Sequence, residues 1–98
     1  MKSYHVMIKP TAVRDLALRF QQITEDSPDN AITWYLGVIK AIEKLDVLAE
    51  RCPLAPEDAD IQQGIRHLII GSYRVLYRIN GKDVDVLHVR HSVHDRVL

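Results

Sequence analysis

Hydrophobic and polar residues alternate through the last third of the chain. The alternation runs through residues 65–70, 73–79 and 84–91, and each run predicts a β-strand. A Gly-Ser pair separates the first two runs, and Asn80-Gly81 opens the turn between the last two, which is a strong hairpin signal. We therefore predict an antiparallel meander of three strands in this region.

The first half of the chain shows helical spacing instead. Residues 4–8 predict one short strand, which ends at Pro10 because proline cannot donate a ladder hydrogen bond. Apolar residues then recur every three or four positions, first over residues 13–23 and again over residues 28–51. We predict two helices here, with Thr11 as the N-cap of the first.

The predicted order of elements is β-α-α-β-β-β. It indicates an α+β fold in which a helix hairpin packs on one face of a mainly antiparallel sheet. A proline-containing acidic connector at residues 53–60 separates the hairpin from the meander. The length of 98 residues suits one domain, so we take residues 1–98 as a single domain.

The second predicted helix is apolar on two faces in its first half. One face is expected to meet the sheet, and the other must meet the first helix or a partner. A helix hairpin that packs on itself accounts for most of this surface. The candidates for contact with a partner protein or a second copy of the chain are Ile32, Leu36 and Ile39.

Composition narrows the class of protein. Apolar residues make up 47% of the chain, and 13 Lys and Arg balance 13 Asp and Glu. A net charge of zero argues against a highly basic protein that coats nucleic acid. No apolar run approaches the roughly 18 residues of a membrane helix, and the start of the chain does not resemble a signal peptide. We expect a cytoplasmic protein with no membrane partner.

The charge is distributed unevenly. Residues 1–60 have a balance of −3, whereas residues 61–98 have a balance of +3 and four of the five histidines. A surface that meets phosphate or another polyanion is therefore expected in the second part, although so small a swing also arises by chance. Strand alternation places Arg74 and Arg78 on one sheet face, with Leu76 between them. The candidates for nucleic-acid or target binding are Arg66, Arg78, Arg90 and His94.

The sequence offers no cofactor motif. It contains no Gly-rich phosphate loop and no Cys-x-x-Cys pair, and the late histidines lack zinc-ligand spacing. The single cysteine, Cys52, lies on an apolar helix stripe, where packing is the expected role. We expect no metal and no cofactor.

Four segments in order give the chain a family resemblance. They are Arg51-Cys-Pro-Leu-Ala-Pro-Glu57, Ile65-Arg-His-Leu68, Gly71-Ser-Tyr-Arg-Val-Leu-Tyr-Arg78 and Val86-Leu-His-Val-Arg-His91, and Asp95 follows the last of them. Together they resemble the RelE/ParE superfamily of toxins from bacterial type II toxin–antitoxin modules, also known as the plasmid-stabilisation family. The resemblance covers nearly the whole chain. It implies a growth-arresting toxin that is controlled by a cognate antitoxin.

The resemblance leaves two targets open. The RelE-like branch cuts mRNA on the ribosome without a metal, and the ParE-like branch inhibits DNA gyrase. For a nuclease, the resemblance implies Arg74 for the phosphate charge and Glu57 as the base, with His91 or His94 as the acid. That branch usually has a lysine-rich segment before the meander and a terminal tyrosine. Here residues 53–72 contain no lysine, and no tyrosine follows His91.

The ending of the chain is closer to the ParE-like pattern. Val-Arg-His-Ser-Val-His-Asp resembles a last strand closed by His-small-x-Arg-Asp, with His94 in the place of the usual arginine. We therefore favour gyrase inhibition over mRNA cleavage. A remnant that still binds an antitoxin but is no longer toxic is the further alternative.

Overall fold

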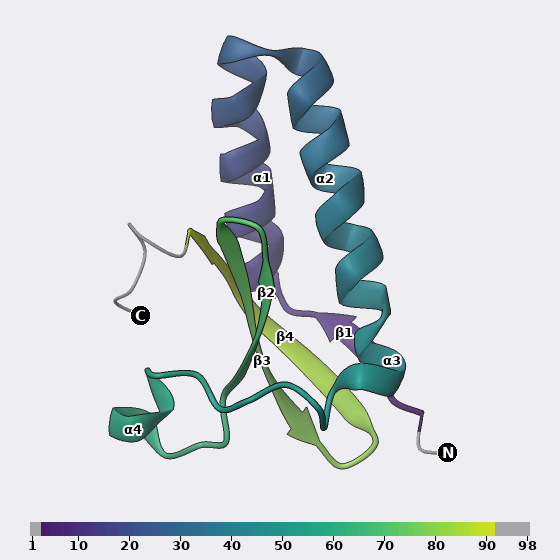
Figure 1. Ribbon diagram of the computed structural model, residues 1–98, viewed down its shortest axis with the longest axis vertical. Helices are drawn as coiled ribbons and strands as arrows, with labels where there is room; N and C mark the ends of the chain where they lie inside the picture. The colour runs from purple at the N-terminus through teal and green to yellow at the C-terminus, as the bar shows by residue number, and fades with distance from the viewer. Residues whose placement is uncertain (1–2, 92–98) are drawn as a thin grey trace.

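The computed structural model describes residues 3–91 and confirms the predicted mixture of helices and strands (Figure 1). The order along the chain also matches the prediction, with short helical turns added between the hairpin and the meander. The elements are β1 (His5–Ile8), α1 (Pro10–Asp26), α2 (Pro28–Glu43), α3 (Leu45–Leu48), α4 (Asp58–Ile61), β2 (Arg66–Ile70), β3 (Tyr73–Asn80) and β4 (Asp83–His91).

The four strands form one sheet in the order β1-β4-β3-β2. The pairs β2–β3 and β3–β4 are antiparallel, as the meander predicts, and β1 lies parallel to β4. Gly81 has a φ of 63° in the β3–β4 turn, a conformation that glycine adopts at no steric cost. The sheet is therefore mainly antiparallel, and the short first strand extends it on the β4 side.

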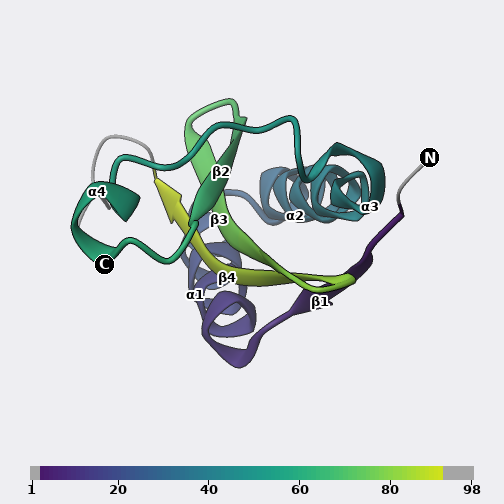
Figure 2. The same cartoon turned by 90° about the horizontal axis from the view of Figure 1, so that it is seen from below.

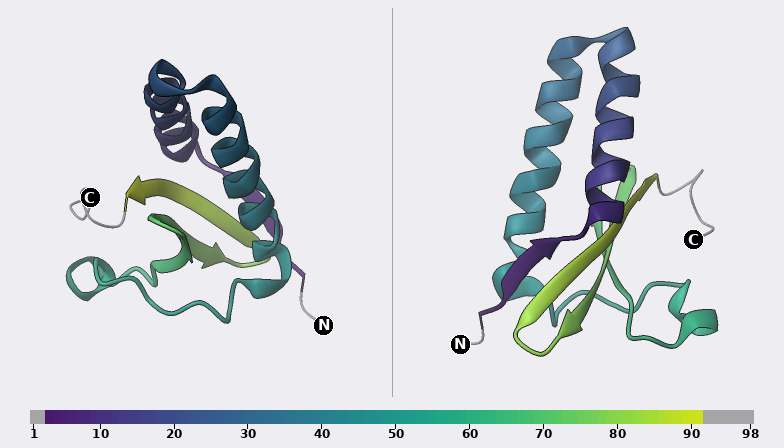
Figure 3. Two further views of the ribbon diagram at one scale, coloured as in Figure 1. Left: turned by 45° about the horizontal axis from the view of Figure 1, so that its top comes forward. Right: turned by 180° about the vertical axis from the view of Figure 1, so that it is seen from behind.

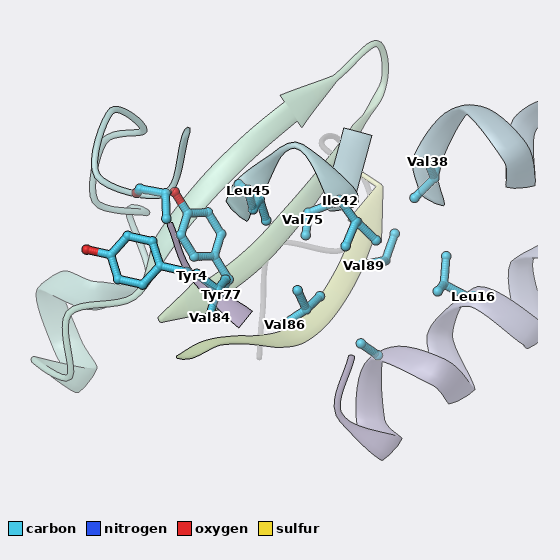
Figure 4. Close-up of a cluster of buried hydrophobic side chains, with 12 residues drawn as sticks. Tyr4, Leu16, Val38, Ile42, Leu45, Val75, Tyr77, Val84, Val86 and Val89 are labelled. Carbon is cyan, nitrogen blue, oxygen red and sulfur yellow. The ribbon is translucent and has the colours of Figure 1, made fainter. Parts of the chain in front are cut away.

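The helix hairpin α1–α2 stands over one face of the sheet, and the segment with α4 lies on the other (Figure 3). Seen from below, the hairpin and the α4 segment flank the twisted strands on different sides (Figure 2). We call these two sides the helix face and the loop face. Ile42 and Leu45 pack against Val75 and Tyr77 on the helix face, and all four are buried (Figure 4). This confirms the predicted core face of the middle strand.

Two predictions about the helices are wrong. Thr11 is not a cap: Lys9 is the N-cap, Pro10 begins α1, and the Thr11 hydroxyl donates to the Leu87 carbonyl at 2.6 Å. The second helix does not continue to residue 51, because the chain bends at Lys44 after α2. The bend buries Leu45 completely and lets the Asp46 carbonyl accept the Tyr4 amide.

A β-bulge interrupts the β3–β4 pairing. Leu76 pairs with His88, whereas the next residue, Tyr77, pairs with Val86, so Leu87 is the additional residue. Leu76 and Leu87 pack on the loop face against Ala55 and Ile65, which flank α4. The predicted connector is therefore partly helical, and it covers a second, smaller core.

Candidate functional site

Arg74 and Glu57 meet on the loop face. Alternation along β3 directs Arg74 away from the main core, and Glu57 is the residue before α4. The Arg74 Nη1 donates to Glu57 Oε1 at 2.9 Å, and Nη2 donates to Oε2 in a second, shorter bond. Only 7% of the arginine side chain and 9% of the glutamate side chain are exposed. The result is a buried, bidentate ion pair.

The segment that presents Glu57 is shaped by local hydrogen bonds. Asp58 Oδ1 accepts the backbone amides of Gln63 and Ile65, each at 2.9 Å. Gln62 adopts a left-handed conformation with a φ of 55°, which closes α4. The resulting tight loop returns the chain to β2 and holds Glu57 over β3.

His67 completes this charged cluster. It lies on the neighbouring strand β2, and its Nδ1 is 3.3 Å from Arg74 Nη1. Burial, and then the positive charge of Arg74, lower the pKa of His67, so the imidazole is neutral near pH 7. The hydrogen bonds from Arg74 lower the pKa of Glu57, and the same bonds raise the pKa of Arg74.

The arrangement limits the chemistry that these residues can do. A carboxylate whose pKa is lowered below its usual value of 4.5 is a weaker general base near pH 7. A guanidinium that already donates two hydrogen bonds to a carboxylate has its bidentate edge occupied. In the closed pair, each partner therefore blocks the catalytic role of the other.

The other predicted nuclease residue, His91, lies on the opposite face of the sheet. It pairs with Tyr73 across β3–β4, and its ring contacts the Tyr73 ring edge-on with centroids 5.2 Å apart. Arg74 pairs with the next residue, Arg90. The structure therefore brings Arg74 and Glu57 together and leaves His91 on the helix face. His94 lies outside the described residues.

Two of the remaining predicted arginines, Arg66 and Arg78, contact groups on different elements. Arg66 projects to the helix side, where its Nη1 donates to the Cys52 carbonyl at 2.5 Å. Arg78 shares the loop face with Arg74, and its Nε is 3.8 Å from the buried carboxylate of Asp85. These contacts place Arg66 and Arg78 on different sides of the sheet rather than in one basic surface.

Asp15 is a site residue that the sequence did not reveal. Its Oδ2 lies 3.0 Å from His88 Nδ1 and accepts the Val89 amide at 3.1 Å. Together with the Thr11 hydroxyl, Asp15 binds the edge of β4 beyond the end of β1. No local signal marks this contact, because 74 positions separate Asp15 from Val89.

An apolar groove lies along the helix hairpin, next to the end of β1. It has a volume of about 330 Å³ and lies between α1 and α2. Ile32 and Leu36 lie on the same stripe of α2 as Ile39, and 51% and 61% of their surfaces are exposed. Apolar side chains form most of the groove's surface. Its lining residues are Ile8, Val13, Leu16, Ala17, Phe20, Tyr35 and Ile39.

Within residues 3–91, no three side chains of His, Cys, Asp or Glu gather closely enough to hold a metal ion. In the same range, no helix is both long enough and apolar enough to cross a membrane.

The fold is that of RelE/ParE-like toxins, and comparison with known proteins identifies the family. The family model described as "ParE toxin of type II toxin-antitoxin system, parDE" matches residues 6–96. The chain therefore belongs to the ParE toxin family of type II toxin–antitoxin systems. No curated protein sequence shows significant similarity to the chain.

Two solved structures share the fold. One, the chromosomal ParDE toxin–antitoxin system from P. aeruginosa, has a TM-score of 0.76 at 16% identity, over 91% of this chain and 96% of that one. The other, the toxin–antitoxin complex RelBE2 from Mycobacterium tuberculosis, has a TM-score of 0.61 at 29% identity. That match covers 91% of this chain and 98% of the other.

Proposed function

We propose that this ParE-family chain is a growth-arresting toxin that inhibits DNA gyrase and does not cleave mRNA. The closed Arg74–Glu57 pair carries the proposal. A metal-free ribonuclease needs a free base and a free cation at the phosphate. Here the two residues best suited to those roles neutralise each other in a buried contact.

The energetic cost of opening the pair supports the same choice. Removing one partner from a buried ion pair costs about 3–5 kcal/mol. If separation on the loop face costs that much, the open form is present at roughly one molecule in 10² to 10⁴. A nuclease that used this pair would lose a similar factor in rate, unless favourable contacts with RNA offset the free energy of opening.

The runner-up is a ribosome-dependent mRNA endonuclease. The observation in its favour is that Arg74, Glu57 and His67 gather in one cluster on the loop face. An RNA phosphate that displaced the Glu57 carboxylate would convert the cluster into a catalytic site. Arg74→Ala would then reduce mRNA cleavage by about 10²–10³-fold.

We further propose that the apolar groove of the hairpin receives the cognate antitoxin. Ile32, Leu36 and Ile39 would supply the rim and floor of that contact on α2. Both structural neighbours come from toxin–antitoxin systems. A second copy of the chain is the competing occupant, and light scattering of the free protein tests it. A monomer at micromolar concentration favours the antitoxin.

The proposed target can be tested with purified components. Gyrase and supercoiled plasmid are incubated with the chain, and the products are treated with detergent and protease to reveal gyrase-linked breaks. The proposal predicts linear plasmid that appears only when chain and gyrase are both present and that disappears when the antitoxin is added. If plasmid stays intact while ribosome-bound mRNA is cut, the endonuclease is the correct function. If neither substrate changes, the chain is a non-toxic remnant that binds an antitoxin.

A further inference from the structure

His67 is held beside the Arg74–Glu57 pair, and the proposed inhibition of gyrase does not use it. Its backbone amide donates to the Pro53 carbonyl at 3.1 Å, and Leu76 is its neighbour across the strand pair. The residue is partly buried, and its Nδ1 is 3.3 Å from Arg74 Nη1. The backbone bonds of β2 therefore keep the imidazole ring next to the pair.

The contact between His67 and Arg74 requires a neutral ring. A guanidinium group only donates hydrogen bonds, so His67 Nδ1 is the acceptor and the ring proton is on Nε2. Arg74 Nη1 has two hydrogens, and the other one is directed at Glu57 Oε1, 2.9 Å away. A single nitrogen of Arg74 therefore connects the histidine to the glutamate.

Protonation of His67 would make this contact repulsive. Nδ1 would become a donor that faces another donor, and the two positively charged groups would have nitrogen atoms 3.3 Å apart. The charged groups that act on the ring are Arg74 from β3 and Glu57 from the segment before α4. Burial and the charge of Arg74 both lower the pKa of His67, whereas Glu57 raises it. Of these two neighbours, only the Glu57 carboxylate can stabilise a protonated ring.

Glu57 is placed where its carboxylate can change partners. It precedes α4, which has four residues and none that is buried. The backbone bonds that join this segment to the start of β2 are made by Pro53 and Ala55, not by Glu57. Rotation about the side-chain bonds of Glu57 therefore moves the carboxylate and leaves those backbone bonds intact. Arg74, in contrast, is buried on the central strand β3.

We propose that protonation of His67 transfers the Glu57 carboxylate from Arg74 to His67, so that the three residues form a pH-sensitive switch on the loop face. With a neutral histidine, the charges of the arginine and the glutamate cancel. With a protonated histidine, the cluster carries one net positive charge, and the edge of Arg74 that the carboxylate occupied is open. The switch does not depend on the target of the toxin, because all of its contacts lie within the chain.

Nuclear magnetic resonance of the full chain tests the switch between about pH 7.5 and about pH 4.5. The Cε1–H signal of His67 reports its protonation, and the Nη–H signals of Arg74 report the bonds to Glu57. We expect both sets of signals to change with the same midpoint. At the acidic end, Arg74 Nη–H exchange with water should be at least about tenfold faster than in His67→Gln at the same pH. Glutamine keeps an acceptor for Arg74 but cannot be protonated.

Two further variants make the test specific. His67→Lys places a permanent positive charge beside Arg74, so Arg74 exchange should be fast already at pH 7.5, where acid unfolding plays no part. His5→Gln is the matched control, since the His5 side chain is 91% exposed and lies on β1, at the other edge of the sheet. It should leave the response of Arg74 unchanged.

Three results would each overturn the proposal. The first is an Arg74 signal that does not follow the titration of His67. The second is equal Arg74 exchange in the wild-type chain and in His67→Gln at the acidic end. The third is slow Arg74 exchange in His67→Lys at pH 7.5. The amide of Val75, in the main core, reports global unfolding, and if its protection is lost before His67 titrates, the result for His67→Lys decides.

Discussion

The Arg74 guanidinium donates hydrogen bonds from both of its Nη atoms to the Glu57 carboxylate, and both side chains are more than nine-tenths buried. The pair joins β3 to a segment whose own helix, α4, has no buried residue. The segment is also held on the sheet by the small apolar cluster around Ala55 and Ile65 and by backbone hydrogen bonds, from the Ala55 amide to the Ile65 carbonyl and from the His67 amide to the Pro53 carbonyl. The ion pair therefore adds a buried, charged contact between this segment and β3.

Breaking the pair should destabilise the protein. We expect Arg74→Ala and Glu57→Ala each to lower the free energy of unfolding by about 3–5 kcal/mol, because each leaves a buried charge without its partner. The double variant should lose much less than the sum of the two, and urea unfolding measures this coupling. Arg78→Ala is the matched control on the same strand. Its contact with Asp85 is longer, 40% of the Arg78 side chain is exposed, and Lys9 Nζ stays 3.6 Å from the Asp85 carboxylate in the variant. The loss should therefore be about 0–1 kcal/mol. Additive losses at residues 57 and 74 would contradict the structural role.

Acidification should destabilise the fold in two steps. The pKa of His67 is lowered from 6.5 in the folded state, so the unfolded chain takes up its proton first and stability falls below about pH 6.5. The pKa of Glu57 is lowered from 4.5, so its contribution is present above that pH and is lost as the pH falls further. Melting temperatures between pH 7.5 and 2.5 measure both steps. His67→Gln should remove the first step and keep the second; an unchanged profile would show that His67 does not cause it.

Asp15 should matter for stability although it lies on a helix surface. Asp15→Ala removes the acceptor for the Val89 amide and for the His88 ring, and we expect a loss of about 1–3 kcal/mol in the free energy of unfolding. Asp26→Ala, an exposed aspartate at the end of the same helix, is the control and should change stability by less than about 0.5 kcal/mol. Hydrogen exchange at Val89 should accelerate in the first variant only. Equal effects of the two substitutions would refute the contact.

The proposed antitoxin groove makes a separate prediction. Leu36→Glu places a charge on the exposed rim of the groove, and we expect antitoxin affinity to fall about 30-fold or more while the melting temperature stays within a few degrees. Val47→Glu, which makes the same change at an exposed residue of α3 outside the groove, should leave the affinity unchanged. Calorimetric titration of both variants gives the comparison. Full affinity in Leu36→Glu would place the antitoxin elsewhere.

Periodicity predicted most of the fold. The alternation of Val75 and Tyr77 gave the core face of β3, and Asn80-Gly81 located the hairpin. These features are local, because strand alternation and turn chemistry depend on neighbouring residues only. The bend at Lys44 was missed because the apolar spacing continues through it, and only contacts with the Tyr4 region reveal it.

The site was less predictable than the fold, because it depends on contacts between residues that lie far apart in the sequence. The resemblance pointed to Arg74 and Glu57, but they are 17 positions apart, and whether they meet depends on how α4 and β2 fold between them. The bulge at Leu87 determines that Arg90 pairs with Arg74, and no residue pattern in the sequence predicted the bulge. His67 and Asp15 joined the site only through tertiary contacts, so sequence reasoning had no signal with which to find them.

The most direct test of the central claim is to induce the chain alone in a bacterial host and map mRNA 5′ ends and gyrase-linked DNA breaks in the same culture. We predict that DNA breaks accumulate while mRNA ends remain at the level of an uninduced culture. Arg74→Ala, expressed at the same folded level, should leave the mRNA ends unchanged, because no cleavage depends on Arg74. New mRNA ends that vanish in Arg74→Ala, without DNA breaks, would contradict the account and assign the closed pair to catalysis.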